Sequence, residues 1–272
     1  MKKQLLAIIL MSTFITGCQT TSGGGVSIWM QKDENTKSKD YSYINDPTGS
    51  APKNKVHSFQ ISSECGDIKR NSKNASKHIG KWHDSDCGEN SVRSEIGENV
   101  WDDHRPGEKQ PKEAWYRWNV FLPKDYPIQE GGKLHLGQFH NGECPHVSFT
   151  STDDDNGKLY FETMKTWQGD CKETLRMPFI SIQELRGKWT EFVMFARWSN
   201  KGDGKFLIYI NGELAMKLDG IRTLTKGKES VNYLKVGIYQ CCNSKKIPIK
   251  PASALFTNPE ISKKPFKSLK NN

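Results

Sequence analysis

Two short segments of the sequence place polar, titratable side chains at alternate positions. Gln138 and His140 stand two residues apart, and Lys235 and Tyr239 stand four residues apart in a second segment. A histidine titrates near neutral pH and can act as a general base, and a tyrosine hydroxyl can give or take a proton. An amide and an ammonium group can donate hydrogen bonds to an anion. These residue types indicate proton transfer on an anionic reactant.

A third segment, residues 92–96, adds a guanidinium and a carboxylate. Arg93 and Glu95 alternate with Val92, Ser94 and Ile96. Successive side chains of a strand point to opposite faces, so Arg93 and Glu95 share one face if this segment is a strand. A guanidinium pairs with a carboxylate through two parallel hydrogen bonds. Arg93 is therefore a candidate to bind the anionic group of the reactant.

The same alternation predicts that the two other segments are strands that bury one face. Phe139 lies on the apolar side of its segment, and Leu234, Val236 and Ile238 form the apolar side of residues 233–239. Alternation of this kind is usual for a sheet with one solvated face. A mixture of histidine, tyrosine, amide and guanidinium groups on three such faces instead favours a functional site.

Further strands are predicted in the rest of the chain. Asn211 and Gly212 form a preferred two-residue hairpin turn, and residues 182–187 indicate one helical turn. The run 189–198 is largely apolar, which is consistent with a strand buried on both faces. The other predicted strands are residues 115–122, 205–210, 213–218 and, as the last one, 254–257.

Many strands and little helix predict an all-β fold, a two-sheet sandwich or jelly roll. A chain of 272 residues is a usual length for one such domain. The predicted organisation is a signal peptide over 1–18, a flexible tether over 19–54, the sandwich over 55–262 and a basic tail over 263–272.

The three polar strands also resemble a known family. Arg93-Ser94-Glu95-Ile96, Gln138-Phe139-His140 and the spacing Tyr233-x-Lys235-x-Gly237-x-Tyr239 are similar to the motif strands of jelly-roll polysaccharide lyases. That group includes alginate lyases, glucuronan lyases and heparin lyase I, and the flanking sequence is most similar to the heparin lyase I group. The resemblance covers roughly residues 88–261. It implies a concanavalin-like sandwich with a concave substrate groove.

Two positions depart from the alginate lyase pattern. Gly97 stands where that pattern has a second arginine, and Cys241 stands where it has a glutamine. The resemblance therefore implies a uronate-containing polysaccharide as substrate without fixing which one.

The resemblance implies β-elimination, which removes the C5 proton of a uronate and expels the oxygen on C4. The carboxylate must be neutralised first, and Gln138 and Arg93 are predicted to do this. His140 is the predicted base, and Tyr239 is predicted to protonate the leaving oxygen or to act as base itself. The charge of Lys235 favours the phenolate form of Tyr239. No cofactor or catalytic metal is required.

A further set of residues is predicted to contact the substrate around these five. His146 follows His140 closely, and His83 can reach the site from a preceding loop. Four other histidines, His57, His78, His104 and His135, are assigned to the surface or to structural roles. The full predicted substrate-binding set is Glu95, Arg117, Asn119, Tyr233, His146 and His83.

Charge and composition fit an anionic partner. The formal net charge is +9, and loss of Lys2 and Lys3 with a signal peptide lowers it to about +7. A basic balance suits nucleic acid, anionic lipid or an anionic polysaccharide, and charge alone does not choose among them. The resemblance selects the polysaccharide, so no nucleic acid partner is predicted, and the protein is expected to be a monomer.

The first residues predict export. Lys2 and Lys3 precede an apolar stretch too short to cross a bilayer, and Ile15-Thr16-Gly17-Cys18 resembles the lipobox of bacterial lipoproteins. Cys18 is then the lipidated first residue of the mature chain. Gln19 after it, instead of aspartate, favours the outer membrane. The protein is therefore expected in the bacterial cell envelope, held to the membrane only by the lipid; the alternative is an ordinary signal peptide.

Six cysteines remain after Cys18, and an even count in an exported chain favours disulfides. Local pairing would join Cys65 to Cys87 and Cys144 to Cys171, but six cysteines allow 15 connectivities. A zinc site of Cys65, Cys87 and the histidines between them is the alternative, although its spacing matches no standard finger. The resemblance to heparin lyase I also admits a structural calcium ion, for which no ligands are assigned.

Other functions remain open on the same fold. A carbohydrate-binding module can keep a grooved sheet without catalysis, but it has no need for His140, Tyr239 and Lys235 at this spacing. A glycoside hydrolase requires two facing carboxylates, and Glu95 has no evident partner in the sequence. A surface adhesin is the least specific alternative.

Overall fold

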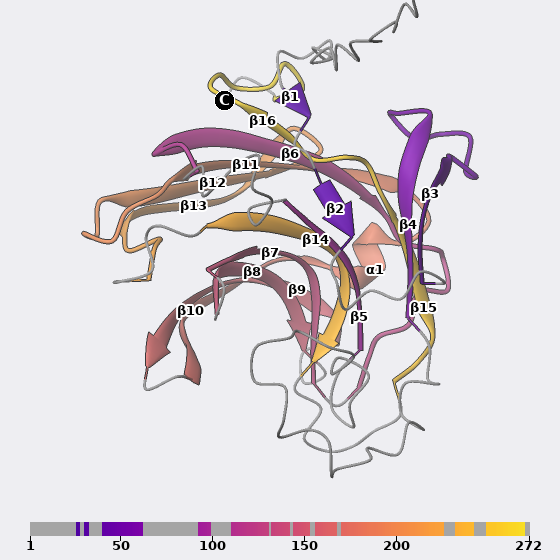
Figure 1. Cartoon of the computed structure of the whole chain (residues 1–272), viewed down its shortest axis with the longest axis horizontal. Coiled ribbons are helices and arrows are strands. Elements are labelled where there is room, and N and C mark those ends of the chain that lie inside the picture. Colours follow the sequence, from indigo (N-terminus) through magenta and orange to yellow (C-terminus); the bar gives the residue numbers. More distant parts are fainter. Residues whose placement is uncertain are drawn as a thin grey trace, which may run out of the picture.

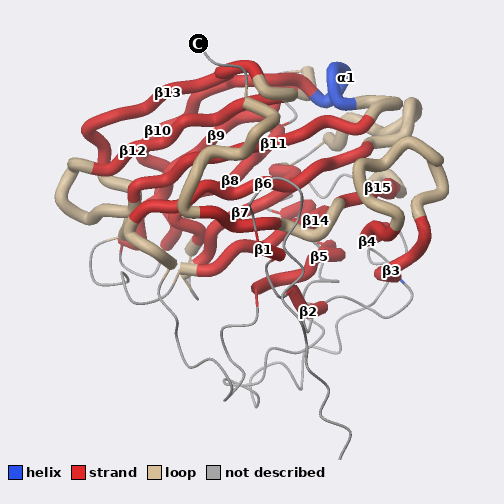
Figure 2. The backbone as a smooth tube through the Cα atoms, turned by 90° about the horizontal axis from the view of Figure 1, so that it is seen from above, coloured by secondary structure: helices blue, strands red, loops and turns tan. Residues whose placement is uncertain are grey.

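The computed structural model describes residues 26–27, 30–32, 40–61, 92–98, 110–130, 132–141, 144–152, 156–167, 170–225, 232–241 and 249–269. Within these ranges the chain forms two antiparallel sheets that face each other (Figure 1). Strands are the main secondary structure of the described part of the chain, which has one short helix at the rim of the sandwich (Figure 2). The predicted all-β sandwich is confirmed.

The first sheet contains nine strands. Its main path runs through β13 (Glu213–Ile221), β12 (Gly204–Ile210), β11 (Trp189–Arg197), β6 (Glu113–Phe121), β15 (Ala252–Phe256), β4 (Lys55–Ile61) and β3 (Tyr41–Asn45). β16 (Glu260–Ser262) pairs with β6 beside this path, and β1 (Val26–Ser27) pairs with β16.

The second sheet contains seven strands. Their order is β10 (Asp170–Ser181), β9 (Lys158–Trp167), β8 (Pro145–Thr152), β7 (Lys133–His140), β14 (Tyr233–Cys241), β5 (Val92–Glu98) and β2 (Met30–Lys32). Figure 1 shows that this sheet is curved, with its convex face toward the first sheet and its concave face turned away. The three polar segments of the sequence are β5, β7 and β14, which lie side by side in this sheet.

Aromatic packing between the sheets fixes which faces point inward. The ring of Tyr116 meets that of Phe139 edge-on, with centroids 4.9 Å apart, and Trp118 meets Phe149 in the same way at 5.3 Å. Such pairs contribute about 0.5–1.5 kcal/mol each beyond the area that they bury. Because Phe139 and its apolar neighbours occupy the core, the polar side chains of β7 point to the concave face.

The local turn and helix predictions are confirmed. Asn211 and Gly212 both have positive φ, 50° and 82°, as the turn between β12 and β13 requires. The helical turn is α1 (Ile182–Leu185), which begins with a capping box between Ser181 and Glu184.

Three expectations about the sandwich need correction. β11 is not buried on both faces: Phe192 and Met194 lie in the core, but Glu191 and Phe195 are partly exposed on the outer side. Phe195 packs there against Trp115, with centroids 5.1 Å apart, so the run is apolar because an aromatic cluster covers the outer face.

Parts of the expected tether pair with the sheets, and the expected tail contributes a buried residue. β1, β2 and β3 all fall within residues 19–54, and each pairs with a strand of the sandwich. Beyond the domain boundary expected at 262, Phe266 is buried, with the guanidinium carbon of Arg117 4.3 Å from the centroid of its ring. Polar composition concealed these strands, because β1 and β3 lie at edges of the first sheet and β2 lies at an edge of the second.

Within the described ranges, no helix has the length and apolar character that crossing a bilayer requires.

Candidate active site

β14 lies between β7 and β5, so the three polar segments form one surface. In the register of the sheet, Lys235 stands opposite Gln138 of β7 and Tyr239 stands opposite Arg93 of β5. Tyr233 stands opposite His140. The five predicted catalytic residues therefore come together on the concave face, as neighbouring positions on three adjacent strands.

Glu95 lies buried under this surface and binds two of its residues. Its side chain has no exposed area, and both of its oxygens accept from Nε2 of Gln138, at 3.0 and 3.3 Å. Nε of Arg93 lies 3.4 Å from the same carboxylate. A buried charge is stable only when it is paired and hydrogen-bonded. Glu95 thus holds Gln138 and Arg93 in place, and its burial keeps it from the direct substrate contact that the sequence predicts.

Gly237 lets β14 and β5 approach each other at this point. Its φ is +143°, and a Cβ atom there would lie 2.3 Å from the carbonyl oxygen of Ser94 and 2.7 Å from Cα of Glu95. Contacts that short do not occur, so any side chain would push the two strands apart. The glycine of the motif is therefore required by packing between the strands that carry Tyr239 and Arg93.

The ring of Tyr239 is held from both neighbouring strands. Arg93 of β5 places its guanidinium carbon 4.0 Å from the ring centroid. From β7, the ring of His135 stacks on Tyr239, with centroids 5.4 Å apart and planes 24° apart. Tyr239 is partly exposed, whereas His135 is buried.

His140 and Tyr233 form a second pair at the other end of these strands. The hydroxyl of Tyr233 lies 3.2 Å from Nδ1 of His140. Lys235 is buried, with Nζ 5.9 Å from the centroid of Tyr233. If Nδ1–H donates to the tyrosine oxygen, the lone pair of His140 is on Nε2, where a general base needs it.

His135 is the site residue that sequence reasoning missed. Strict alternation from His140 places position 135 on the apolar face, but the register between β7 and β8 shifts between His135 and Gly137. Such an irregularity moves a side chain to the other face. Burial, with the charges of Lys133 and Arg93, lowers the pKa of His135 to about 3, so its ring is neutral at neutral pH.

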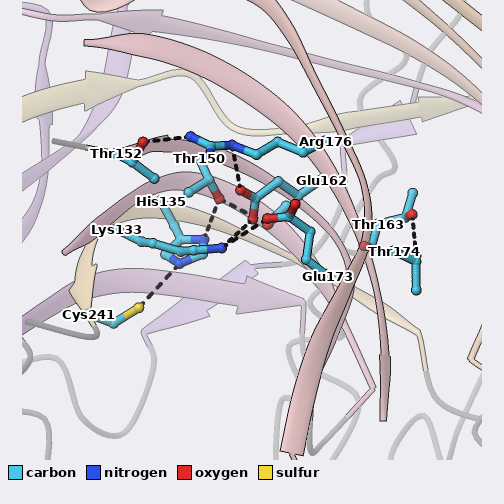
Figure 3. A network of polar contacts seen from close by, with 11 residues as sticks. Lys133, His135, Thr150, Thr152, Glu162, Thr163, Glu173, Thr174, Arg176 and Cys241 are labelled. Atoms are coloured by element: carbon cyan, nitrogen blue, oxygen red, sulfur yellow. Dashed lines mark hydrogen bonds and ion pairs between the residues drawn. The ribbon is translucent and has the colours of Figure 1, made fainter. Parts of the chain in front are cut away.

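The polar surface continues over β8, β9 and β10, as Figure 3 shows. Glu162, whose side chain is fully buried, lies 2.9 Å from Nζ of Lys133 and 3.4 Å from Nε of Arg176. Arg176 also donates to Oγ1 of Thr152 at 2.6 Å and lies over the ring of Tyr160 at 3.8 Å. Burial raises the pKa of Glu162, against the effect of Lys133. No short motif marked this cluster, because its residues come from four strands.

Two residues of the predicted substrate-binding set lie in the other sheet. Arg117 and Asn119 belong to β6, on the side away from the core. Arg117 is held there by an ion pair with Glu260, and Asn119 contacts Thr257 through backbone and side chain. The strand alternation that buries their neighbours in the core also keeps them off the concave face of the second sheet.

His146 is held in a structural position. Its ring is 1% exposed, and Nδ1 accepts from the backbone N–H of Thr225 at 3.0 Å. His83 lies outside the described residues, and so does Cys18. The structure therefore gathers the predicted catalytic residues with Tyr233 and Glu95. Arg117 and Asn119 lie in the other sheet, and His146 is buried against Thr225.

The cysteines are described in part. Cys144 is disulfide-bonded. Cys241 carries a buried thiol, with Sγ 3.4 Å from Nε2 of His135. The side chains of the other predicted disulfide or zinc residues, Cys65, His78, His83, Cys87, Cys171 and Cys242, lie outside what the structure describes. Among the described residues, no group of three or more His, Cys, Asp or Glu side chains is placed to hold a metal ion.

Comparison with known proteins gives a family and a fold. A family model described as polysaccharide lyase matches residues 62–253. No curated protein matches the sequence. The structure is similar to an endo-β-1,4-glucuronan lyase from the fungus Trichoderma reesei, with a TM-score of 0.60 and 14% identity, over 88% of this chain and 91% of that one.

A second similar structure is a family 7 alginate lyase in complex with a product. Its TM-score is 0.51 at 16% identity, and the match covers 83% of this chain and 84% of that chain. At these identities the likeness shows a shared jelly-roll fold.

Proposed function

Because the chain belongs to the polysaccharide lyase family, we propose that it cleaves a uronate-containing polysaccharide by β-elimination on the concave face of its second sheet. The observation that carries this proposal is the meeting of Arg93, Gln138 and Tyr239 on three adjacent strands. The polymer lies across these strands, with one uronate over β14.

The first chemical requirement is to neutralise the uronate carboxylate, because a charged carboxylate makes the C5 proton barely acidic. Arg93 offers its guanidinium, and Gln138 keeps a second amide N–H beyond the one that binds Glu95. Both donors are held by the buried carboxylate of Glu95, so little reorganisation is needed as the enolate forms.

His140 then takes the C5 proton. Its partial exposure gives it access to a polymer on the concave face, and its contact with Tyr233 fixes the ring. A neutral imidazole can accept this proton, which is what a general base requires.

Tyr239 completes the reaction by protonating the oxygen that leaves C4. The electron pair of the broken C5–H bond forms the C4–C5 double bond, and the C4–O bond breaks as the phenol proton moves to that oxygen. The ammonium group of Lys235, two same-face positions away, stabilises the resulting phenolate. Restoration of the phenol and of neutral His140 by solvent returns the enzyme to its starting state.

Among uronate polymers, we rank glucuronan and heparin-type chains ahead of alginate. Gly97 and Cys241 replace two residues of the alginate lyase pattern. Lys133 and Arg176 add further cationic donors on the same face, where they suit a polymer with repeated anionic groups.

A panel of polymers tests the proposal. Glucuronan, heparin, heparan sulfate, hyaluronan and alginate are each incubated with the exported domain, and the ultraviolet absorbance of the unsaturated product is followed. We expect at least one polymer to give absorbance with the wild type, and none to do so with a His140→Ala/Tyr239→Phe double variant. Binding of a polymer without any absorbance would replace the lyase by a carbohydrate-binding module.

We further propose that the protein is a lipoprotein of the bacterial cell envelope, anchored in the outer membrane through Cys18. The lipobox-like Ile15-Thr16-Gly17-Cys18 and the short apolar stretch before it support this location. An anchored lyase would meet its polymer at the cell surface or in the periplasm.

A further inference from the structure

His135 takes no part in the proposed proton transfers, but its ring stacks on that of Tyr239, with centroids 5.4 Å apart. The two residues stand directly opposite each other on β7 and β14, and Arg93 stands opposite Tyr239 on the other side, on β5. Because the two partners come from opposite neighbouring strands, the tyrosine ring is enclosed between the imidazole and the guanidinium.

The imidazole is itself fixed at both nitrogens. Nδ1 lies 2.9 Å from Oγ1 of Thr150, and Nε2 lies 3.4 Å from Sγ of Cys241 (Figure 3). Thr150 donates its own hydroxyl proton to Oγ of Ser148 at 3.0 Å. Its oxygen must therefore accept from Nδ1–H, which leaves Nε2 to accept from the thiol of Cys241.

This chain of donors and acceptors requires a neutral imidazole with its proton on Nδ1. A charged ring would have to donate at both nitrogens, and it would also face the nearby charges of Arg93 and Lys133. The imidazole of His135 is held at both nitrogens and is neutral at neutral pH. Its orientation is therefore fixed, and so is the surface on which Tyr239 stacks.

We propose that His135 is a positioning residue for catalysis: its ring and the guanidinium of Arg93 clamp the ring of Tyr239 between them and fix the direction of the tyrosine hydroxyl toward the polymer. The inference rests on the proposed function, because it assigns a purpose to the geometry of Tyr239. A shift of about 1 Å in a reacting group can lower a rate by roughly 10²-fold, so a clamp of this kind matters to turnover.

The first test replaces His135 by leucine, which removes the ring, and by phenylalanine, which keeps a flat ring against Tyr239. We expect His135→Leu to lower kcat by about 10–100-fold with KM changed less than about twofold, since binding groups are untouched. His135→Phe should retain several-fold more kcat than His135→Leu. Equal losses of kcat in the two variants would overturn the proposal that the His135 ring positions Tyr239.

The second test combines His135→Leu with Tyr239→Phe. If His135 acts only through the tyrosine hydroxyl, the residual turnover of the Tyr239→Phe variant, measured over long incubations, should change less than about twofold on adding His135→Leu. A further loss as large as that in the wild-type background would show a merely structural role and contradict the proposal.

His57 supplies a matched control. It is also a buried, stacked histidine, hydrogen-bonded to Tyr41 and Asn258, but it lies on β4 in the other sheet. His57→Leu should lower the melting temperature about as much as His135→Leu and leave kcat unchanged. A comparable loss of kcat in His57→Leu would attribute the effect of His135 to lost stability.

A measurement on the wild type decides the geometry even if a variant fails to fold or no polymer is cleaved. In nuclear magnetic resonance spectra of the histidine-labelled protein, His135 should stay neutral between pH 5 and 8, protonated at Nδ1, and should show ring contacts to Tyr239. Titration of His135 near pH 6, or the absence of those contacts, would overturn the inference. Cleavage of no polymer together with these contacts would reject the lyase proposal alone.

Discussion

At the scale of single residues, the site depends on a carboxylate that never reaches its surface. Glu95 is fully buried and binds Gln138 and Arg93, the two donors assigned to the uronate. His140 and Tyr239 are the two partly exposed groups that can transfer protons. In the proposed mechanism, the buried charge orients the donors and the partly exposed titratable groups transfer the protons.

The first prediction concerns those two proton-transfer groups. His140→Ala and Tyr239→Phe should each lower kcat by about 10²–10⁴-fold, because each removes one proton transfer from the transition state. Polymer affinity and melting temperature should change little. Steady-state rates on the cleaved polymer give the result.

Tyr43→Phe is the control for Tyr239→Phe, since Tyr43 is 51% exposed on β3 of the other sheet. It should keep full turnover. Wild-type turnover in both His140→Ala and Tyr239→Phe would remove these residues from the mechanism.

The second prediction concerns Gly237. Gly237→Ala should destabilise the protein by about 3 kcal/mol, because the new Cβ meets the backbone of β5 and the residue must keep a positive φ. Gly202→Ala is the matched control: its φ is +90°, but a Cβ there meets nothing within 4 Å. Denaturant unfolding should show a loss of about 1 kcal/mol for this control. Equal losses in the two variants would mean that backbone conformation alone, without close approach of the strands, explains the glycine.

At the scale of elements, the alternation of polar and apolar residues predicted the three strands that carry the site. β5, β7 and β14 are strands with most of the predicted faces, because each places apolar side chains, such as Ile96, Phe139 and Val236, in the core. The sequence could not show that these strands are neighbours in the order β7, β14, β5, since pairing between distant segments leaves no local pattern.

The residues that the sequence analysis missed or misplaced have local explanations. The register shift near His135 breaks the period of two, so the residue that stacks on Tyr239 was assigned to a structural role. Lys133, Glu162 and Arg176 come from three strands and meet only after the sheet forms. Arg117 and Asn119 were predicted to bind substrate, but β6 lies in the first sheet.

The third prediction uses the buried histidines of the two sheets. Burial lowers the pKa of His57 to about 4 and that of His135 to about 3, below the ordinary value near 6.5. The unfolded chain therefore binds more protons than the folded one between these values, and stability falls as pH falls from about 6.5. Between pH 6.5 and 5, each histidine should cost about 2 kcal/mol of unfolding free energy.

His57→Phe isolates one of the two contributions, because the phenyl ring can keep the stacking with Tyr41 and Tyr43. Denaturant unfolding at pH 7 and pH 5 should show that this variant loses about 2 kcal/mol less than the wild type over that interval. An identical pH dependence in the two proteins would mean that folding does not lower the pKa of His57.

At the scale of the whole molecule, the sandwich has one concave face, on which we propose that the polymer binds (Figure 1). The concave face carries the proposed catalytic residues on β5, β7 and β14. Lys133 of β7, Glu162 of β9 and Arg176 of β10 meet on the same face (Figure 3). A long face suits a chain substrate, because contacts away from the cleaved bond can hold the polymer in place.

The fourth prediction concerns the anchor. Protein extracted from membranes of a bacterial expression host should begin at Cys18 and carry acyl chains on that residue. Intact mass spectrometry and sequencing of the N-terminal peptide give the answer. Cys18→Ser should abolish processing at this position and release the protein from the membrane fraction. An unacylated wild-type protein with cleavage elsewhere would leave an ordinary signal peptide.

The fifth prediction tests the central claim, that the bond is broken by elimination at a uronate. A cleaved polymer is digested in water enriched in oxygen-18, and the fragment masses are measured. Elimination adds no water, so the fragments should contain no label, their masses should sum to that of the parent chain, and each new non-reducing end should absorb in the ultraviolet. Incorporation of one labelled oxygen per cleavage, without that absorbance, would show hydrolysis and contradict the account.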